Sequence, residues 1–220
     1  MTFEADERGA KKRDYWWTVL FTDPIAIPLS RFLAKKRWLT PDQVTIVALI
    51  LGILVGVLFA TGERWGLIAG GVTFYAAFIV DCVDGKLARA LGVTSARGEH
   101  LDALADGGRR ASASLGIGIL LWGEDPILWV LIYVVLAYYF LEISGAEKGQ
   151  SGSGLGGKWS QALAKRRLLP NPGMPDVQAI VFILGPITGL VVPALWLGIA
   201  MVTVAILMTI RRRWAAGGRS

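Results

Sequence analysis

The chain alternates between long apolar runs and short polar or charged segments. A helix needs about 20 mostly apolar residues to cross the hydrocarbon core of a bilayer. Six runs approach this length, at residues 43–60, 66–88, 99–122, 126–145, 176–191 and 194–210. The second and third runs carry charges at one end, and only a turn near Pro193 separates the last two. The pattern predicts an all-α polytopic membrane protein with six transmembrane helices.

The segment before the first run mixes aromatic, aliphatic and polar residues over 15–38 and ends in three basic residues at 35–37. Pro24 and Pro28 argue against one uninterrupted helix, but the C-terminal part is typical of an interfacial helix on anionic lipid. Such a helix could border a lipid-entry site or act as a simple anchor. The predicted organisation is a cytoplasmic N-terminal and interfacial segment at 1–38, a six-helix membrane domain at 39–213 and a tail at 214–220.

The positions of the basic residues predict the orientation in the membrane, because Lys and Arg concentrate in cytoplasmic loops. Of the 23 Lys and Arg residues, all except Arg64 fall on the side of the N-terminal segment, the 89–98 loop, the 146–175 loop and the C-terminus, when the adjoining helix ends are included. Both termini should therefore be cytoplasmic, in a protein of the cytoplasmic membrane.

Composition supports this class of protein and excludes others. Hydrophobic residues make up 54% of the chain, which also holds 9 Trp and 27 Gly, and this is too apolar for a soluble domain. The net charge of +6 does not indicate nucleic-acid binding, because basic residues in so apolar a chain mark the cytoplasmic membrane face. Since Cys82 is the single cysteine, an intramolecular disulfide and a cysteine zinc site are excluded.

Two acidic helical segments on either side of a short loop carry the candidate chemistry. They read Asp81-Cys82-Val83-Asp84-Gly85-Lys86-Leu87-Ala88-Arg89 and Gly98-Glu99-His100-Leu101-Asp102-Ala103-Leu104-Ala105-Asp106. Asp81 and Asp84 share one helix face with Gly85 and Ala88, and Asp102 and Asp106 form an i, i+4 pair on the next helix. The loop returns the chain, so the two acidic faces can converge. Small residues on these faces would leave room for a ligand, and Gly98 or Gly107 could permit tight helix contact.

Four carboxylates at the end of a membrane span require a cation or another partner. All-oxygen ligation suits Mg²⁺ or Mn²⁺, whose remaining positions water and substrate phosphates can fill. A pyrophosphate substrate is therefore predicted. Three alternatives are weighed against it: ion pairs of Asp81 and Asp84 with Lys86 or Arg89, a divalent-cation transporter, and a prenyl-pyrophosphate enzyme. A transporter would favour ligands near the bilayer midplane, whereas these aspartates lie near a cytoplasmic end.

These two segments resemble the signature of the CDP-alcohol phosphotransferase (CDP-alcohol phosphatidyltransferase) family, D-x-x-D-G-x-x-A-R, eight residues, then G-x-x-x-D-x-x-x-D. They match it at every defined position. The resemblance implies a six-helix membrane fold, commonly a homodimer, with the active site at the cytoplasmic surface. It implies that Asp81, Asp84 and Asp102 ligate the metal, and that Asp106 contributes to the metal site and is the catalytic general base.

The resemblance also implies the substrates. The donor-binding positions are Gly85, Ala88, Arg89 and Ser95, and the segment Thr40-Pro41-Asp42-Gln43 resembles a Thr-Pro element of the family near the nucleotide. CDP-diacylglycerol is the expected donor, with release of CMP, and a soluble CDP-alcohol is the alternative. A phosphorylated acceptor such as glycerol phosphate or inositol phosphate would need a cationic pocket, for which Lys165, Arg166, Arg167 and Arg211 are candidates.

Two departures from the family pattern leave the acceptor open. Gly107 stands where many phospholipid synthases of the family have Arg or Lys, and Ser144-Gly145-Ala146-Glu147 lacks the basic residues that inositol-phosphate transferases commonly carry there. An uncharged acceptor therefore remains an alternative. His100 and Cys82 occupy variable positions and are expected to be a surface residue and a packing residue, respectively.

Overall fold

In the computed structural model, residues 11, 13–145, 163, 165–169, 171 and 173–217 are described. These residues are almost entirely helical, and within them the only β-type pairing is an isolated bridge between Asp14 and Leu168. The elements are η1 (Thr18–Thr22), α1 (Asp23–Lys36), α2 (Pro41–Ala60), α3 (Arg64–Leu91), α4 (Ala96–Leu120), α5 (Ile127–Gly145), α7 (Met174–Gln178), η2 (Ala179–Leu184), α8 (Gly185–Thr188) and α9 (Val191–Gly217), where η denotes a π-helical turn.

Local capping explains where α2 and α4 begin. The Thr40 hydroxyl accepts a hydrogen bond from the Gln43 backbone N–H, and the Gln43 side chain accepts one from the Thr40 N–H, which makes a capping box. The Ser95 hydroxyl caps α4 by accepting from the Gly98 N–H. Gly92, with φ of +69°, ends α3 in the left-handed conformation that favours glycine. The turn between α3 and α4 is thereby fixed at both ends.

Each of the six predicted apolar runs coincides with a helical segment, but only some of these segments have the length and composition of a membrane span. Four qualify among the described residues: Pro41–Ala60, Arg64–Leu91, Ile127–Ser144 and Val191–Arg211. The charges in the first half of α4 set it apart, and the apolar segment Met174–Thr188 is shorter. The chain is an integral membrane protein.

Glycine contacts bring α2 and α4 together. A Cβ placed on Gly116 of α4 would lie 2.4 Å from the backbone oxygen of Gly56 in α2, and a Cβ on Gly52 would lie 2.9 Å from the Cβ of Arg109. Gly52 and Gly56 therefore let the two backbones approach as small residues do in other membrane helix pairs. The tight contact expected at Gly107 is not found, since the nearest atom to a Cβ there is the end of the Arg110 side chain at 4.0 Å.

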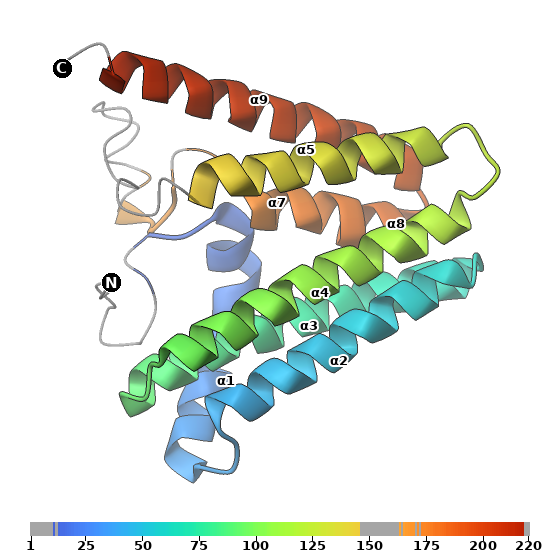
Figure 1. The fold of residues 1–220 in the computed structure, drawn as a ribbon. Helices are drawn as coiled ribbons and strands as arrows, with labels where there is room; N and C mark the ends of the chain where they lie inside the picture. The colour runs from blue at the N-terminus through green and yellow to red at the C-terminus, as the bar shows by residue number, and fades with distance from the viewer. Residues whose placement is uncertain are drawn as a thin grey trace.

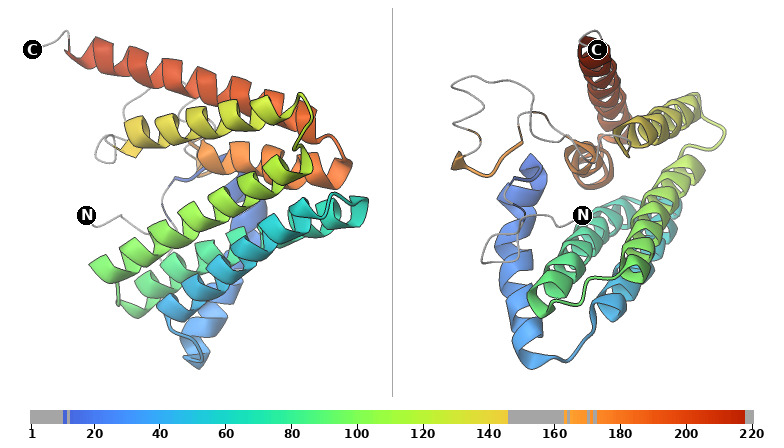
Figure 2. Two further views of the ribbon diagram at one scale, coloured as in Figure 1. Left: turned by 45° about the vertical axis from the view of Figure 1, so that its right-hand side comes forward. Right: turned by 60° about the vertical axis from the view of Figure 1, so that its left-hand side comes forward.

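The helices form two groups joined by the segment 174–188 (Figure 1). Helices α2, α3 and α4 pack side by side, whereas α5 pairs with α9. Segment 174–188 contacts both α3 and α9 and lies between the groups, as two further views show (Figure 2). The α3–α4 turn and the C-terminal ends of α5 and α9 lie at one end of the molecule, and the α2–α3, α4–α5 and α8–α9 turns lie at the other (Figure 1).

Helix α1 crosses this assembly at a steep angle and packs on α3 (Figure 1). The α-helical conformation continues through Pro28. The change from π-helical to α-helical conformation falls at Asp23, next to Pro24. Ala26 and Leu33 are buried against α3 and α2, whereas Ile25 and Phe32 are exposed. Helix α1 therefore packs one face against α3 and α2, and its other face exposes apolar side chains that no other part of the described chain covers.

Candidate active site

Three of the four signature aspartates converge where α3 ends and α4 begins. Asp81, Asp84 and Asp102 each offer a carboxylate oxygen, and these oxygens lie within 4.8 Å of one another. Asp84 is buried, whereas Asp102 is exposed, so the cluster opens to the surface on the α4 side. This oxygen-only set fits the ligand preference of Mg²⁺ or Mn²⁺ and leaves positions for water and phosphate oxygens.

A threonine on α2 fixes the buried member of this cluster. The Thr45 hydroxyl donates a hydrogen bond to Oδ2 of Asp84 over 2.5 Å, and both residues are buried. One Asp84 oxygen is thereby held in place. The sequence does not indicate this role of Thr45, because a threonine inside an apolar run carries no signal of its partner on another helix.

Asp106 stands apart from the three-aspartate cluster and contacts two arginines of its own helix. Its Oδ1 forms a very short contact with Arg109, and its Oδ2 lies 3.0 Å from Nη1 of Arg110. The Arg109 guanidinium also lies 3.4 Å from Oδ2 of Asp81. Arg109 therefore bridges α4 to the α3 aspartate, a contact that the signature does not include and that the sequence alone did not predict. Its only sequence signal is its position three residues after Asp106.

The predicted donor-binding residues surround the same end of α3. A Cβ on Gly85 would lie 3.4 Å from the Arg89 guanidinium, so the glycine leaves space beside that side chain. Asp42 at the start of α2 lies 4.0 Å from Arg97 at the start of α4. The Pro41–Gln43 element and the Ser95 cap therefore lie at the N-termini of two neighbouring helices. The positive dipole ends of these helices favour the binding of phosphate.

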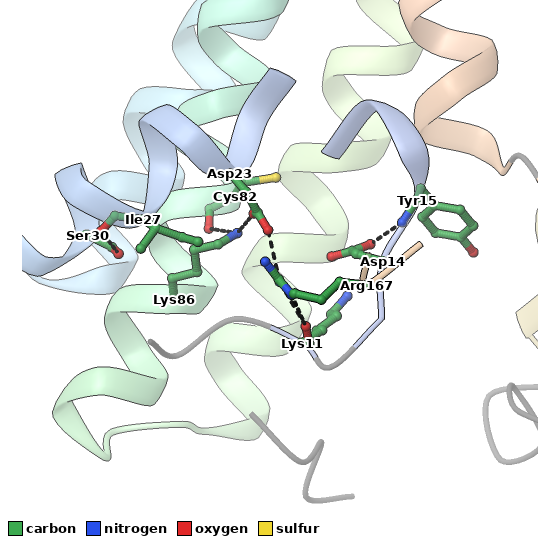
Figure 3. A network of polar contacts seen from close by, with 9 residues as sticks. All are labelled: Lys11, Asp14, Tyr15, Asp23, Ile27, Ser30, Cys82, Lys86 and Arg167. Carbon is green, nitrogen blue, oxygen red and sulfur yellow. Dashed lines mark hydrogen bonds and ion pairs between the residues drawn. The ribbon is translucent and has the colours of Figure 1, made fainter. Parts of the chain in front are cut away.

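An ion triad between α3, α1 and the segment of Arg167 includes Lys86, which occupies a variable position of the signature (Figure 3). Lys86 Nζ lies 3.0 Å from Oδ1 of Asp23 on α1, and Nη2 of Arg167 lies 3.0 Å from Oδ2 of the same carboxylate. Lys86 and Asp23 are both almost fully buried. Pairing of Lys86 with Asp81 or Asp84 was weighed as an alternative to metal binding, and the structure places its ion pair with Asp23 instead.

The predicted acceptor residues divide into two kinds. Arg167 pairs with Asp23, and its guanidinium also donates to the backbone oxygen of Lys11, so it ties its segment to α1 and the N-terminal segment. Lys165, Arg166 and Arg211 are exposed. None of the four is brought into contact with the aspartate cluster in the described structure, and the loop residues 146–162 lie outside the described residues.

The variable positions behave as expected. His100 is exposed and does not join the aspartate cluster. Cys82 is a free, partly buried cysteine on α3.

The fold and the site define a helical integral membrane protein with a carboxylate cluster suited to a divalent cation. The profile of the CDP-alcohol phosphatidyltransferase family matches residues 38–164, and the chain belongs to this family.

Two curated relatives are named as synthases of inositol-phosphate lipids. The archaetidylinositol phosphate synthase of Pyrococcus horikoshii is 32% identical over 117 residues, which cover 53% of this chain and 58% of that protein. The phosphatidylinositol phosphate synthase of Streptomyces avermitilis is 33% identical over 124 residues, which cover 53% of this chain and 48% of that protein. The chain thus aligns with about half of the length of these relatives.

The fold extends beyond the aligned region. The crystal structure of Mycobacterium tuberculosis phosphatidylinositol phosphate synthase with CDP-DAG bound superposes with a TM-score of 0.65 at 20% identity, covering 87% of this chain and 94% of that one. The same enzyme in complex with manganese and citrate gives a TM-score of 0.58 at 20% identity, covering 86% and 89%. The likeness therefore includes the helices after the family match.

Proposed function

We propose that this protein transfers a phosphoalcohol group, specifically a phosphatidyl group from CDP-diacylglycerol, to an acceptor hydroxyl and releases CMP. The observation that carries the proposal is the convergence of Asp81, Asp84 and Asp102 within a complete family signature. Binding of CDP-DAG and of manganese by the mycobacterial enzyme supports the lipid donor and the divalent cation. We assign the same cation type, Mg²⁺ or Mn²⁺, to this cluster.

In this mechanism Asp81, Asp84 and Asp102, with a contribution from Asp106, would hold the cation, which when bound neutralises the donor's pyrophosphate and stabilises departing CMP. The donor lies against Gly85, Ala88 and Arg89, with the N-terminal ends of α2 and α4 directed at its phosphates. Asp106 accepts the proton of the attacking hydroxyl. The new phosphorus–oxygen bond forms as the bond to CMP breaks, so the product is a phosphodiester.

We propose a phosphorylated acceptor, because the two curated relatives are named as synthases of archaetidylinositol phosphate and of phosphatidylinositol phosphate. Gly107 and the Ser144–Glu147 segment depart from that pattern, so an uncharged acceptor, or a soluble CDP-alcohol as donor, is the second candidate. A divalent-cation transporter is the alternative from another class. Release of CMP distinguishes a transferase from such a transporter, because only the transferase produces CMP.

We further propose the topology of the family. Six helical segments span the membrane, both termini and the active site face the cytoplasm, α1 lies at the interface, and the protein functions as a homodimer. The domain limits follow as 1–38, 39–213 and 214–220. The exposed apolar face of α1 supports the interfacial placement, and the position of the α3–α4 turn at the same end as the C-terminal end of α9 supports the orientation.

The first test measures CMP release by the purified protein from radiolabelled CDP-diacylglycerol against glycerol phosphate, inositol phosphate and uncharged alcohols. We expect CMP and a labelled lipid product with one acceptor, loss of both in EDTA, and recovery with Mg²⁺ or Mn²⁺, since the clustered carboxylates need a cation to hold pyrophosphate. Full turnover in metal-free buffer would refute the mechanism. A soluble CDP-alcohol assayed in parallel tests the alternative donor.

The second test concerns the acceptor site and uses three neighbouring basic residues. If Lys165 or Arg166 binds the acceptor phosphate, its change to Gln should raise the acceptor KM by about tenfold to a hundredfold with little change for the donor, as expected for losing a charge-assisted contact of about 1.5–3 kcal/mol. Arg167→Gln is the matched comparison. Because Arg167 pairs with Asp23, its loss should lower the melting temperature without a selective rise in acceptor KM.

Unchanged acceptor kinetics in Lys165→Gln, Arg166→Gln and Arg211→Gln, singly and combined, would argue for an uncharged acceptor. A selective rise in acceptor KM for Arg167→Gln at an unchanged melting temperature would restore Arg167 as a phosphate ligand.

A further inference from the structure

Arg110 lies beside Asp106 on a face of α4 that points away from the contact with α2. Gly108 faces α2, since a Cβ there would lie 2.8 Å from a side-chain carbon of Leu49. Residues three or four apart on a helix are neighbours on its surface, so Asp106, Gly107 and Arg110 share another side of α4. All three are partly exposed. A substrate that reaches the Asp106 carboxylate therefore also comes close to Arg110.

Two arginines contact Asp106 in the part of the chain that the structure describes, and they differ in access. Only 1% of the Arg109 side chain is exposed, and the rings of Phe74 and Phe78 lie 5.5 and 5.1 Å from its guanidinium carbon. The side chain of Arg110 is 25% exposed, and its Nη1 lies 3.0 Å from Oδ2 of Asp106. Of these two cations, Arg110 is the one that a substrate can touch.

Gly107 leaves space beside the Arg110 guanidinium. The nearest side-chain atom to a Cβ on Gly107 would be Nη2 of Arg110, at 4.0 Å. A guanidinium carries several N–H donors, so a contact with one carboxylate oxygen leaves donors for a second anion. The charge of Arg110 also acts on Tyr133 of α5, which places the guanidinium on the side of α4 toward the second helix group. The arrangement offers an anion a donor and room next to Asp106.

A phosphate is the anion that this place fits. A phosphorylated acceptor must present its hydroxyl at Asp106 while its phosphate lies near four carboxylates, which repel it unless cations offset their charge. Guanidinium groups bind phosphate through charge-assisted contacts that can be bidentate. The four basic residues predicted for the acceptor do not contact the aspartate cluster in the described structure, whereas Arg110 lies directly beside Asp106.

We propose that Arg110 binds the phosphate of the acceptor and thereby selects a phosphorylated alcohol over an uncharged one. The inference rests on the proposed function and names the chemical class of its second substrate. Arg110 lies outside the family signature, and it adds an inner contact to the candidates Lys165, Arg166 and Arg211.

The test compares Arg110→Gln and Arg110→Lys with the wild-type protein. CMP release from CDP-diacylglycerol is measured with glycerol phosphate and inositol phosphate, and with glycerol and inositol as their uncharged counterparts. Calorimetry then measures binding of the two phosphorylated alcohols to the purified protein with Mn²⁺ and CMP, where no transfer can occur. Arg31→Gln is the charge-matched control, because Arg31 is an exposed arginine on α1. Melting temperatures report on folding.

Arg110→Gln should raise the KM and the dissociation constant of the phosphorylated acceptor by about tenfold to a hundredfold, as expected for loss of a charge-assisted contact. The KM of CDP-diacylglycerol should stay within about threefold of wild type, since only acceptor binding is lost. The preference for a phosphorylated over an uncharged acceptor should fall by the same factor as acceptor affinity. Arg110→Lys should keep more of that preference than Arg110→Gln, because an ammonium retains the charge without the planar fork. Arg31→Gln should match wild type.

Unchanged affinity for the phosphorylated acceptor in Arg110→Gln would overturn the proposal. An equal fall of kcat with every acceptor at an unchanged preference would also overturn it, because Arg110 would then act only through Asp106. A wild-type protein that binds neither phosphorylated alcohol but transfers to an uncharged one would overturn it as well. If no CDP-alcohol released CMP, the proposed function would fail, and calorimetry would still decide whether Arg110 binds a phosphorylated alcohol.

Discussion

Asp84→Asn is expected to remove both cation binding and CMP release. Asp84 is the most buried of the three clustered aspartates, and Thr45 fixes one of its oxygens. Asparagine keeps the shape and can still accept the threonine hydrogen bond, but it supplies a neutral amide where the cation needs negative charge. Changes to residues that only orient the ligands of a metal site already cost about tenfold to a hundredfold in affinity, so loss of a ligand should cost at least about a hundredfold.

The measurement is Mn²⁺ binding by electron paramagnetic resonance and CMP release at saturating donor. Asp125→Asn is the matched control, since Asp125 is exposed in the α4–α5 turn at the other end of the molecule. It should match wild type in both assays. Near-normal Mn²⁺ affinity in Asp84→Asn, in a protein that melts like wild type, would remove Asp84 from the metal site.

The sequence predicted the convergence of the acidic segments, because that prediction rests on local rules. Helical spacing places Asp81 and Asp84 on one face, and a short capped turn returns the chain so that Asp102 meets them. Ser95 and Gly92 mark the ends of the turn in the sequence itself. The sequence predicted that all four aspartates converge, and the structure groups Asp81, Asp84 and Asp102, while Asp106 contacts Arg109 and Arg110.

The contacts that complete the site come from other helices and could not be predicted in this way. Thr45 reaches Asp84 from 39 residues away, and Asp23 pairs with Lys86 across α1 and α3. Neither pair has a spacing that indicates contact, because both depend on how helices pack. Arg109 could have been suspected from its place on the face of Asp106, but the bridge to Asp81 requires the α3–α4 geometry.

The helix boundaries show the same division between local and tertiary effects. The starts of α2 and α4 follow from Thr40 and Ser95, whose caps are visible in the sequence. The last predicted span, 194–210, is observed as a helix that extends to Gly217, because hydrophobicity indicates the membrane-embedded part of a helix and not its continuation into polar residues. The π-helical turn η2 within the fifth predicted span has no counterpart in the apolar pattern.

The last expected result concerns Asp106, whose carboxylate contacts Arg109 and Arg110. Asp106→Asn should lower kcat by about a hundredfold to ten-thousandfold, the range for loss of a positioned general base. Mn²⁺ affinity should fall far less than in Asp84→Asn, because Asp106 lies outside the group of Asp81, Asp84 and Asp102 and contacts Arg109 and Arg110. Binding of a CDP-alcohol, measured by calorimetry with Mn²⁺ present, should be retained for the same reason.

The pair of variants is thus diagnostic: Asp84→Asn should lose the cation and the nucleotide together, whereas Asp106→Asn should keep both and lose only the transfer. Turnover at the wild-type rate in Asp106→Asn would refute the base assignment, and a loss of Mn²⁺ affinity equal to that of Asp84→Asn would instead make Asp106 a metal ligand.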